Sequence, residues 1–376
     1  MKFLILILLP LNSHAFSLNK SEISPKNATV LKRVIEKIKK DDLIEELRSF
    51  VQCCGSNRLV GSQSHKKAVD YLKKTIESYD KNKKGVLQLH QFKPDSKFAI
   101  DLYQKDFDTQ IKNKYSATDP LYKTWNGFTQ DMVNAISKRK DTLGTNIIWE
   151  KTGTENPDEY IIVGAHFDTI AHDKNSKRLK EKEDMPGADD NGSAVSILLS
   201  MIKIIESMEI KRSIRFVLFD YEELGFLGSK AYVDKYHSGN NEKIIGMVNL
   251  EMLGHDSKRT DKNKRLGNMK AYIRTPNHAQ YKDDSNLAKI IMNIPNRKIN
   301  TINFELTPNG FNSSDHINFW DKGIAAITFT QNWEEDLNPR YHTKNDFVET
   351  INKKTLYNAY RYIALGVISY VLKLER

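Results

Sequence analysis

The segment "FDYEELGFLGS" (residues 219–229) places two adjacent glutamates, Glu222 and Glu223, at the end of an apolar run. The residues just before them, "IRFVLF" (214–219), have the composition of a buried strand. Neighbouring carboxylates repel each other, so such a pair is unfavourable unless cations lie nearby. Consecutive residues that leave a strand point in different directions. One glutamate can therefore bind a metal ion while the other accepts a proton from a water molecule.

Histidines and carboxylates also follow other apolar runs of the chain. They are His166, Asp168, the pair Asp189 and Asp190 before a predicted helix, Glu251 and His342. Nitrogen and oxygen ligands without thiolates suit Zn²⁺, with Mn²⁺ or Co²⁺ as substitutes. The set exceeds what one tetrahedral zinc ion needs, and it suits a pair of ions about 3.5–4 Å apart that share a carboxylate and a water. Asp168, two residues after His166, is expected to accept a hydrogen bond from the other imidazole nitrogen.

The segments that carry these residues alternate between strand and helix patterns. We expect strands at 86–92, 145–151, 159–165, 214–219, 244–253, 269–274 and 324–330, and helices at 27–50, 64–79, 193–207, 228–236, 314–322 and 353–374. This alternation predicts an α/β fold, a mixed, mainly parallel twisted sheet with helices on both faces. Ligands bind such sheets beyond the carboxyl ends of the strands, where the histidines and carboxylates are expected.

The chain of 376 residues is interpreted as a signal peptide, residues 1–15, and one catalytic domain, residues 16–376. Lys2, a short apolar stretch and a small-x-small site ending at Ala15 are typical of a cleaved secretory signal. We therefore expect a secreted or periplasmic protein without stable membrane insertion. A segment at about 93–142 has weak periodicity and is interpreted as an insertion that forms a cap or surface projection beside the site.

Charge and cysteine content limit the partners and the metal ligands. The net charge is +10, but lysines alternate with acids and no nucleic-acid-binding motif accompanies them, so we expect no nucleic-acid partner. The two cysteines, Cys53 and Cys54, are adjacent. They form either a vicinal disulfide or two buried thiols, and one such pair cannot build a thiolate zinc site.

Six motifs together resemble the family of zinc-dependent aminopeptidases (clan MH) that includes bacterial leucyl aminopeptidases, glutamate carboxypeptidase II and glutaminyl cyclase. They are "VGAHFDT", "GADDNGSA", "DYEELGFLGS", "NLEMLGH", "SSDHINFW" and "YHTKND". The stretch "NRLVGSQSHKKAVDYL" (57–72) resembles the region that leads into the family's N-terminal helix. The resemblance implies the zinc exopeptidase fold, two zinc ions per chain and removal of N-terminal residues from peptide substrates.

The resemblance also implies individual roles. One zinc ion would be held by His166 and Glu251, and the other by Glu223 and His342. Asp190, three residues before Ser193, would bridge the two ions. Glu222 would be the general base, and Tyr341 would donate a hydrogen bond to the oxyanion. Two positions depart from the family pattern: Glu251 stands where an aspartate is usual, and Ala194 where a glycine is common.

Two other activities on this fold remain open. A glutaminyl cyclase usually has a longer segment between the paired glutamates and the following Gly-Ser than the short one before Gly228-Ser229. A carboxypeptidase would share the metal ligands. Aromatic residues at 304–333 either line the substrate pocket or belong to the core: Phe304, Phe311, Phe319, Phe329 and Trp333. The sequence indicates neither the preferred N-terminal residue nor the oligomeric state.

Overall fold

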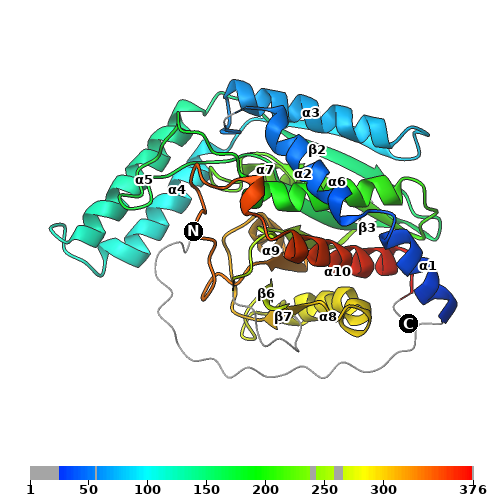
Figure 1. Ribbon diagram of the computed structural model, residues 1–376. Coiled ribbons are helices and arrows are strands. Elements are labelled where there is room, and N and C mark those ends of the chain that lie inside the picture. The colour runs from blue at the N-terminus through cyan, green and yellow to red at the C-terminus, as the bar shows by residue number, and fades with distance from the viewer. Residues whose placement is uncertain (1–24, 56, 238–242, 258–265, 375–376) are drawn as a thin grey trace.

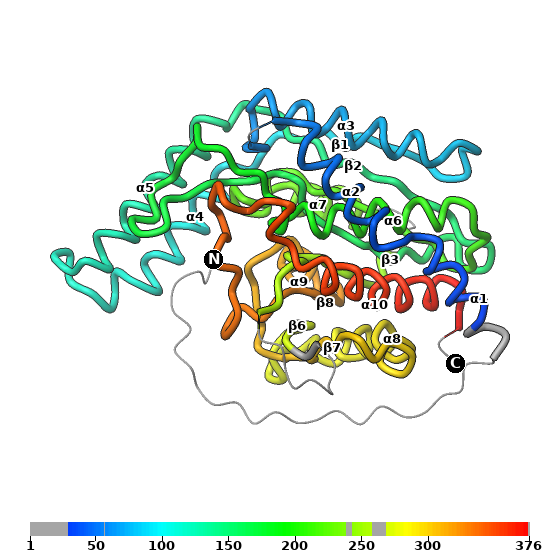
Figure 2. Tube along the Cα trace, viewed as in Figure 1, coloured from blue at the N-terminus to red at the C-terminus, as the bar shows by residue number. Residues whose placement is uncertain are grey.

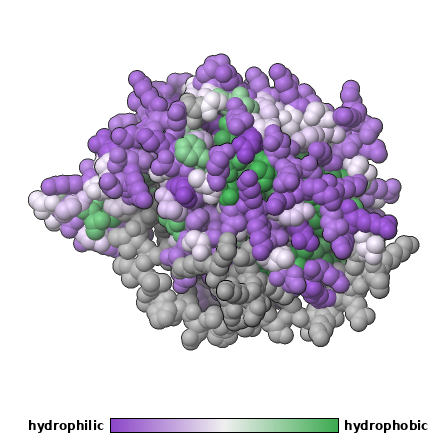
Figure 3. Space-filling model, in the orientation of Figure 1, coloured by the Kyte–Doolittle hydropathy of each residue, from purple (hydrophilic) through white to green (hydrophobic). Residues whose placement is uncertain are grey.

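The computed structural model describes residues 25–55, 57–237, 243–257 and 266–374. The predicted signal peptide, residues 1–15, lies outside this range and stays a prediction. Within the described residues, no helix is both long enough and apolar enough to cross a bilayer. The face in Figure 3 is mostly hydrophilic with small hydrophobic patches, as a chain with 28% charged residues is expected to be.

Eight strands form one mixed sheet in the order β1-β2-β4-β3-β5-β8-β6-β7. Their bounds are β1 Val86–Phe92, β2 Gly144–Lys151, β3 Asn156–His166, β4 Arg212–Phe219, β5 Lys243–Leu250, β6 Leu266–Tyr272, β7 Ile302–Thr307 and β8 Ala326–Thr330. The four central strands β4, β3, β5 and β8 run parallel to one another, and so do β6 and β7. β2 is antiparallel to both β1 and β4, and β6 is antiparallel to β8. The structure thus has the predicted fold class.

Helices cover both faces of this sheet (Figure 1). Their bounds are α1 Pro25–Ile35, α2 Lys40–Cys53, α3 Gln63–Tyr79, α4 Ser96–Phe107, η1 Asp108–Lys112, α5 Pro120–Lys138, η2 Ala188–Ser193, α6 Ala194–Ile205, α7 Leu227–Tyr236, α8 Tyr281–Lys298, α9 His316–Asp321, η3 Val348–Thr350 and α10 Lys353–Val371. Helices α2, α3, α6, α8 and α10 share one core with the sheet. Helices α7 and α9 share a second core on the opposite face.

The alternation of side chains along β3 explains how one strand serves both cores. Ile161 and Val163 belong to the core on the α6 side, whereas Tyr160 and Ile162 belong to the core on the α7 side. Successive side chains of a strand point to opposite faces of the sheet. Because both faces are covered, the strand is apolar at consecutive positions from Tyr160 to Val163 instead of at every second one.

Three of the sequence expectations differ from the structure. The helix expected at 27–50 is two helices, α1 and α2, because the backbone N–H of Lys39 donates to the Asp42 carboxylate (3.0 Å) and starts a new helix. The strand expected to reach residue 253 ends at Leu250. The elements α4, α5, α8 and β7 were not predicted; Pro295 interrupts the pattern of α8, and β7 is short.

Candidate metal centre

The central parallel strands bring the predicted residues to one edge of the sheet. His166 is the last residue of β3, Glu251 directly follows β5, and Glu222 and Glu223 follow β4. His342 lies on the loop after β8. Because β4, β3, β5 and β8 are parallel neighbours, their carboxyl ends lie side by side.

Two imidazoles in this cluster face the same carboxylate, that of Asp190. His166 Nε2 lies 3.3 Å from Asp190 Oδ1 and 3.3 Å from Glu251 Oε1. His342 Nε2 lies 3.2 Å from Asp190 Oδ2 and 2.9 Å from Glu223 Oε2. Asp190 therefore stands between two groups of donors, with one oxygen directed at each.

The donor set fits divalent metal ions. The atoms of His166, Asp190 and Glu251 lie within 4.8 Å of one another, and so do those of Asp190, Glu223 and His342. Glu223 Oε1 and Asp190 Oδ2 are buried and accept no hydrogen bond. Buried carboxylate oxygens usually have a partner, and a cation supplies one. Imidazole and carboxylate donors without thiolate are the ligands that zinc takes in catalytic sites.

The choice of Asp190 over its neighbour Asp189 has a structural basis. The Asp189 carboxylate accepts hydrogen bonds from the backbone N–H of Gly254 and from Asn338 Nδ2, both at 2.7 Å. The Asp189 carboxylate therefore joins the loops that contain Gly254 and Asn338, whereas the Asp190 carboxylate faces the two imidazoles. The Asp346 carboxylate accepts the backbone N–H groups of both aspartates at 3.0 Å. The peptide bond after Asp190 is cis.

Asp168 lies beside His166 and also holds the turn that carries the paired glutamates. His166 Nδ1 lies 3.2 Å from the backbone carbonyl of Asp168 and 3.6 Å from its carboxylate Oδ1, so the nearer partner is the carbonyl and not the predicted carboxylate. The same carboxylate accepts the backbone N–H of Glu222 at 3.1 Å and that of Glu223 at 3.2 Å. Asp168 therefore connects a histidine of β3 to the turn after β4, a link that the sequence did not reveal.

Glu222 is buried next to these donors without a hydrogen bond from them. Its Oε2 lies 3.8 Å from His166 Nε2. Burial raises the pKa of Glu222 well above its ordinary value, and the nearby carboxylates of Glu223 and Glu251 add to the rise, although His166 opposes it. By distance alone Glu222 could also bind a metal together with His166 and Glu223. The distances thus allow either role for it, base or ligand.

The pKa values of the clustered residues indicate that the buried carboxylates favour a positive charge beside them. Burial raises the pKa of Glu223 to about 7, although His342 opposes the rise. Burial acts to lower the pKa of His342, but Glu223 and Asp190 outweigh it and raise the value to about 9. For Asp190, burial acts to raise the pKa, but the facing imidazoles of His166 and His342 outweigh it and hold the pKa below the ordinary range.

Left-handed backbone conformations cluster around these residues. Tyr221 (φ 59°) precedes Glu222, Met252 (φ 44°) follows Glu251, and His342 itself has φ 55°. Phe226 (φ 59°) begins α7 directly after the glutamate turn. A non-glycine residue in this region costs of order 1–3 kcal/mol, and such strain persists where the surrounding structure enforces it. The tight spacing of the donors is thus maintained at some cost in stability.

Tyr341 packs against His342, with 3.7 Å between their ring centroids, and edge-on against Trp333. Burial raises the pKa of Tyr341 well above its ordinary value, and the carboxylates of Asp190 and Glu223 raise it further. The phenol therefore keeps its proton at neutral pH and can act as a hydrogen-bond donor.

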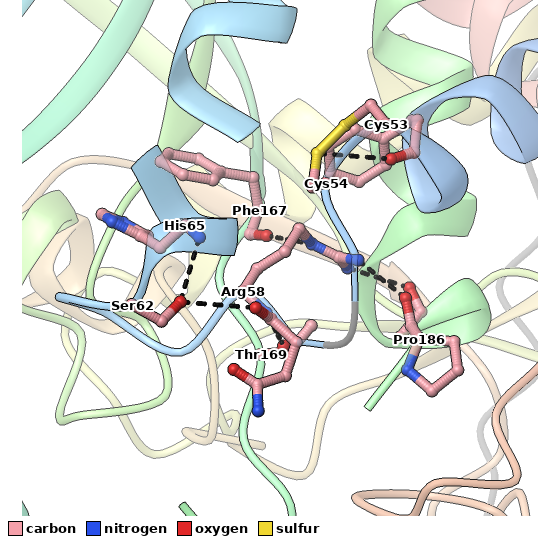
Figure 4. Close-up of a disulfide and its surroundings, with 11 residues drawn as sticks. Cys53, Cys54, Arg58, Ser62, His65, Phe167, Thr169 and Pro186 are labelled. Carbon is pink, nitrogen blue, oxygen red and sulfur yellow. Dashed lines mark hydrogen bonds between the residues drawn. A yellow bond between two sulfur atoms is a disulfide. The ribbon is translucent and has the colours of Figure 1, made fainter. Parts of the chain in front are cut away.

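Sequence reasoning missed two charged residues of the site, Arg58 and Asp315. Arg58 is 2% exposed, and its guanidinium donates to the backbone carbonyls of Phe167 and Pro186 at 2.7 Å and of Gly187 at 3.0 Å (Figure 4). It thereby links the loop after His166 to the loop before Asp190. The pattern "NRLVGS" was noted for its resemblance, but nothing in the sequence indicates these partners.

Asp315 precedes α9 and is fully buried. Burial raises its pKa to about 8, with His166 opposing the rise and Glu251 adding to it. The motif "SSDHINFW" contains this residue and could have identified it.

The structure also decides between the alternatives that the sequence left open for the two cysteines and for the aromatic residues at 304–333. Cys53 and Cys54 form a disulfide at the end of α2, close in sequence to Arg58 (Figure 4). Of the aromatic residues at 304–333, three are buried core residues: Phe304, Phe319 and Phe329. Phe311 and Trp333 are partly exposed and pack against each other.

Comparison with known proteins places this geometry in a family. The model of peptidase family M28 matches residues 146–367. Aminopeptidase YwaD of Bacillus subtilis is 30% identical over 223 residues, which cover 58% of this chain but only 42% of that protein. The chain thus aligns with less than half the length of this curated relative.

Solved structures share the fold at low sequence identity. The zinc aminopeptidase BSAP from Bacillus subtilis has a TM-score of 0.60 at 20% identity, with 89% of this chain and 96% of that chain covered. The glutaminyl cyclase of Porphyromonas gingivalis has a TM-score of 0.61 at 18% identity, with 89% and 99% covered.

Proposed function

Because the chain belongs to peptidase family M28, we propose that it is a zinc-dependent aminopeptidase that removes N-terminal residues from peptides. The observation that carries this proposal is the position of Asp190 between the two imidazoles. A carboxylate with one oxygen toward each of two donor groups is suited to bridging two metal ions. The names of the relatives, which include aminopeptidases and zinc metalloproteases, support the same activity.

In this proposal His166 and Glu251 would hold one zinc ion, Glu223 and His342 would hold the other, and Asp190 would serve both. Zinc in this position would lower the pKa of a coordinated water from 15.7 toward about 7 and polarise the scissile carbonyl. Asp168 supports His166 through its backbone carbonyl and fixes the turn of Glu222 and Glu223 through its carboxylate. A hydrogen-bond partner on the second ring nitrogen keeps a ligand histidine in its productive orientation.

Glu222 is the proposed general base. Its carboxylate accepts the proton of the attacking water and passes it to the leaving amine, so the residue must be ionised before the reaction and protonated midway. Bound cations favour the ionised form, which burial alone disfavours. Tyr341 is proposed to donate its phenolic proton in a hydrogen bond to the oxygen that becomes negative.

Secretion to the periplasm or the medium is proposed together with this activity, on the strength of the signal-like residues 1–15. The substrates would be peptides with a free N-terminus. Mass spectrometry of protein isolated from the producing cell should find an N-terminus directly after Ala15. A chain that still begins at Met1 would contradict cleavage of the signal peptide.

The two glutamates provide the test of the mechanism. Glu222→Gln keeps the ligand set, so zinc content should stay near two ions per chain while kcat falls by about 10²–10⁴. Glu223→Gln should instead lose one ion, and part of its activity should return with excess zinc. Elemental analysis and turnover of an aminoacyl amide measure both. Zinc loss in the first variant with a pure rate defect in the second would exchange the two roles.

Other outcomes would point to a different enzyme of this fold. Metal-replete protein with no more than one ion would contradict the two-zinc site. Release of ammonia from an N-terminal glutaminyl peptide, without hydrolysis of aminoacyl amides, would identify a glutaminyl cyclase. Cleavage restricted to the C-terminal residue of peptides would identify a carboxypeptidase.

A further inference from the structure

His65 lies in the first turn of α3, the helix that packs against β1 and β2 (Figures 1 and 2). Its backbone N–H donates to Ser62 Oγ at 3.0 Å, which begins the helix (Figure 4). The residue is buried, with 5% of its surface exposed. It lies outside residues 146–367, the part of the chain that matches the family model. Its role therefore has to be inferred from its own contacts.

The imidazole of His65 is paired with the carboxylate of Asp220, the residue directly after β4. His65 Nε2 lies 2.8 Å from Asp220 Oδ1, and Asp220 is fully buried. Burial acts to lower the pKa of His65, but Asp220 outweighs it and raises the pKa. Removal of one partner from a buried pair leaves the other without its compensating charge. The two side chains therefore depend on each other.

Asp220 fixes the backbone at the start of the turn that carries the paired glutamates. Its Oδ1 accepts the N–H of Tyr221 and its Oδ2 accepts the N–H of Thr145, both at 2.8 Å. Tyr221 has the left-handed φ of 59°, a conformation that persists in a tyrosine only where the surroundings enforce it. The Asp220 carboxylate thus supports the backbone conformation from which Glu222 leaves the strand.

Three consecutive backbone N–H groups of this turn are bound to buried carboxylates. Asp220 accepts the N–H of Tyr221. Asp168 accepts the N–H groups of Glu222 and Glu223, at 3.1 and 3.2 Å. Asp168 lies on the loop after β3, whereas the Asp220 carboxylate is bound from α3. The turn is therefore held from two separate elements of the fold.

Asn146 of β2 joins the two ends of the same turn. Its Oδ1 accepts the N–H of Asp220 at 3.0 Å, and its Nδ2 donates to the carbonyl of Gly228 at 2.8 Å. A Cβ atom at Gly228 would collide with the Asp220 carbonyl, so the ends of the turn are in contact. A displacement of Asp220 would therefore move the whole turn, residues 220–228.

The imidazole of His65 also contacts the loop after β3. It stacks on the ring of Phe167, with 5.5 Å between the ring centroids and 16° between the ring planes. Phe167 directly follows His166, and its backbone N–H donates to the carbonyl of Phe219 at 3.0 Å. One side chain of α3 thus contacts the residues that follow both β3 and β4.

We propose that His65 is a positioning residue: through Asp220 it fixes the turn that carries Glu222, and through Phe167 it fixes that turn relative to His166. This inference rests on the proposed aminopeptidase function. Glu222 has to reach both the attacking water and the leaving amine, so a shift of its turn lowers the rate of the reaction more than the binding of substrate. Supporting residues around a metal site typically contribute about 10–100-fold to activity or metal affinity.

Two substitutions separate the two contacts of the imidazole. His65→Phe keeps a ring against Phe167 but loses the donor, whereas His65→Gln loses the ring but keeps a nitrogen donor for Asp220. With an alanyl amide as substrate, His65→Phe should lower kcat about 10–100-fold and change KM less. His65→Gln should keep most of the wild-type kcat, because the hydrogen bond to Asp220 is restored.

Ser62→Ala is the matched control. It removes the side chain that accepts the backbone N–H of His65 at the start of α3, and it leaves the imidazole in place. Loss of this helix cap should lower the stability of the protein, but kcat should stay at the wild-type value. A variant that weakens the same helix without affecting the turn thereby separates positioning from general destabilisation.

Asp220→Asn tests the other partner of the pair. It places an amide donor opposite the N–H of Thr145 and should lower kcat in the same range as His65→Phe. The double variant should be no slower than the slower single variant, because residues that act as one unit are not additive. Wild-type kcat in His65→Phe, or equal losses in His65→Phe and His65→Gln, would overturn the proposal. If His65→Phe does not fold, wild-type kcat in Asp220→Asn would overturn it.

Hydrogen exchange separates this inference from the proposed function. Mass spectrometry of the fragment 219–229 reports the protection of the turn without any turnover. In zinc-loaded protein the fragment should exchange about 10-fold faster in His65→Phe than in the wild type, and His65→Gln should resemble the wild type. Faster exchange, together with a wild-type protein that hydrolyses no amide, would sustain the positioning role and refute the aminopeptidase. Unchanged exchange in His65→Phe would refute the positioning role and leave the aminopeptidase standing.

Discussion

The crowding of buried carboxylates at the metal centre predicts an unusual pH dependence of stability. In the metal-free protein, Glu223 faces His342 and Asp190, and burial raises the pKa of Glu223 to about 7 from its ordinary value of 4.5. A group whose pKa is raised by folding binds more protons in the folded state than in the unfolded state. Its contribution to stability is complete below the unfolded pKa and is lost as the pH rises through the folded pKa.

The size of the effect follows from the pKa of Glu223. Each pKa unit corresponds to about 1.4 kcal/mol, so metal-free protein should lose roughly 3 kcal/mol between pH 4.5 and pH 7 on account of this group. For a chain of this length, that is a fall in Tm of roughly 4 °C. The raised pKa of His342 acts in the same direction over a higher window, from its ordinary value of 6.5 to about 9, and is not included in this figure. Asp190 acts in the opposite direction, with a window below about pH 4.

The assay compares chelator-treated and zinc-loaded protein between pH 5 and pH 8 by urea unfolding. Metal-free protein should be less stable at pH 8 than at pH 5. The stabilisation by zinc should grow over the same range, because metal ions replace the protons that the site otherwise requires. Metal-free Glu223→Gln should be more stable than metal-free wild type at pH 8, by up to about 3 kcal/mol, and nearly equal to it at pH 5.

Glu209→Gln is the control, because Glu209 is exposed and precedes β4, whereas Glu222 and Glu223 follow the other end of that strand. It should follow the wild type at every pH. Metal-free stability that is constant or increases from pH 5 to pH 8 would refute the reasoning. So would a Glu223→Gln variant that is less stable than the wild type at pH 8 without metal.

Two further changes test residues around the centre. Tyr341→Phe should lower kcat about 10–1,000-fold if the phenol donates to the oxyanion, and an unchanged kcat with unchanged zinc content would show that the ring only packs against His342. Arg58→Met should leave the carbonyls of Phe167 and Pro186 without a donor, whereas the Gly187 carbonyl keeps the N–H of Gly192. At about 1–3 kcal/mol for each lost partner, thermal denaturation should show a loss of at least roughly 2 kcal/mol. Competition with a chromophoric chelator should show weaker zinc retention, and unaltered retention would mean that Arg58 does not position the ligand loops.

The candidate metal-binding residues were accessible from the sequence because they follow strongly patterned elements. The apolar runs of β3, β4, β5 and β8 are evident, and each is followed by histidine or carboxylate side chains. Parallel packing then requires these ends to meet. The division of the cluster into two groups that share Asp190 came from the resemblance, and the distances are consistent with it.

The supporting contacts could not be derived in the same way. Arg58 meets its carbonyl partners across more than a hundred residues, and no local pattern encodes that approach. The sequence left open whether the aromatic residues at 304–333 line a pocket or belong to the core, and Phe304, Phe319 and Phe329 belong to the core. The segment at about 93–142 was interpreted as an insertion beside the site, but its helices α4 and α5 were not predicted because its periodicity is weak.

The helical hairpin of α4 and α5 lies between β1 and β2, and the way it is attached determines whether it could be replaced by another segment. Phe92, the last residue of β1, is directly paired with Gly144, the first residue of β2, so the hairpin leaves and rejoins the sheet at a single point. A side chain at position 144 would collide with the Phe92 ring, which makes glycine necessary at this junction. A tight turn could close β1 onto β2 without moving the central strands that carry the proposed ligands. The segment can therefore be exchanged between these two ends, provided that its replacement restores the hydrogen bond that Tyr103 donates to the Glu223 carbonyl.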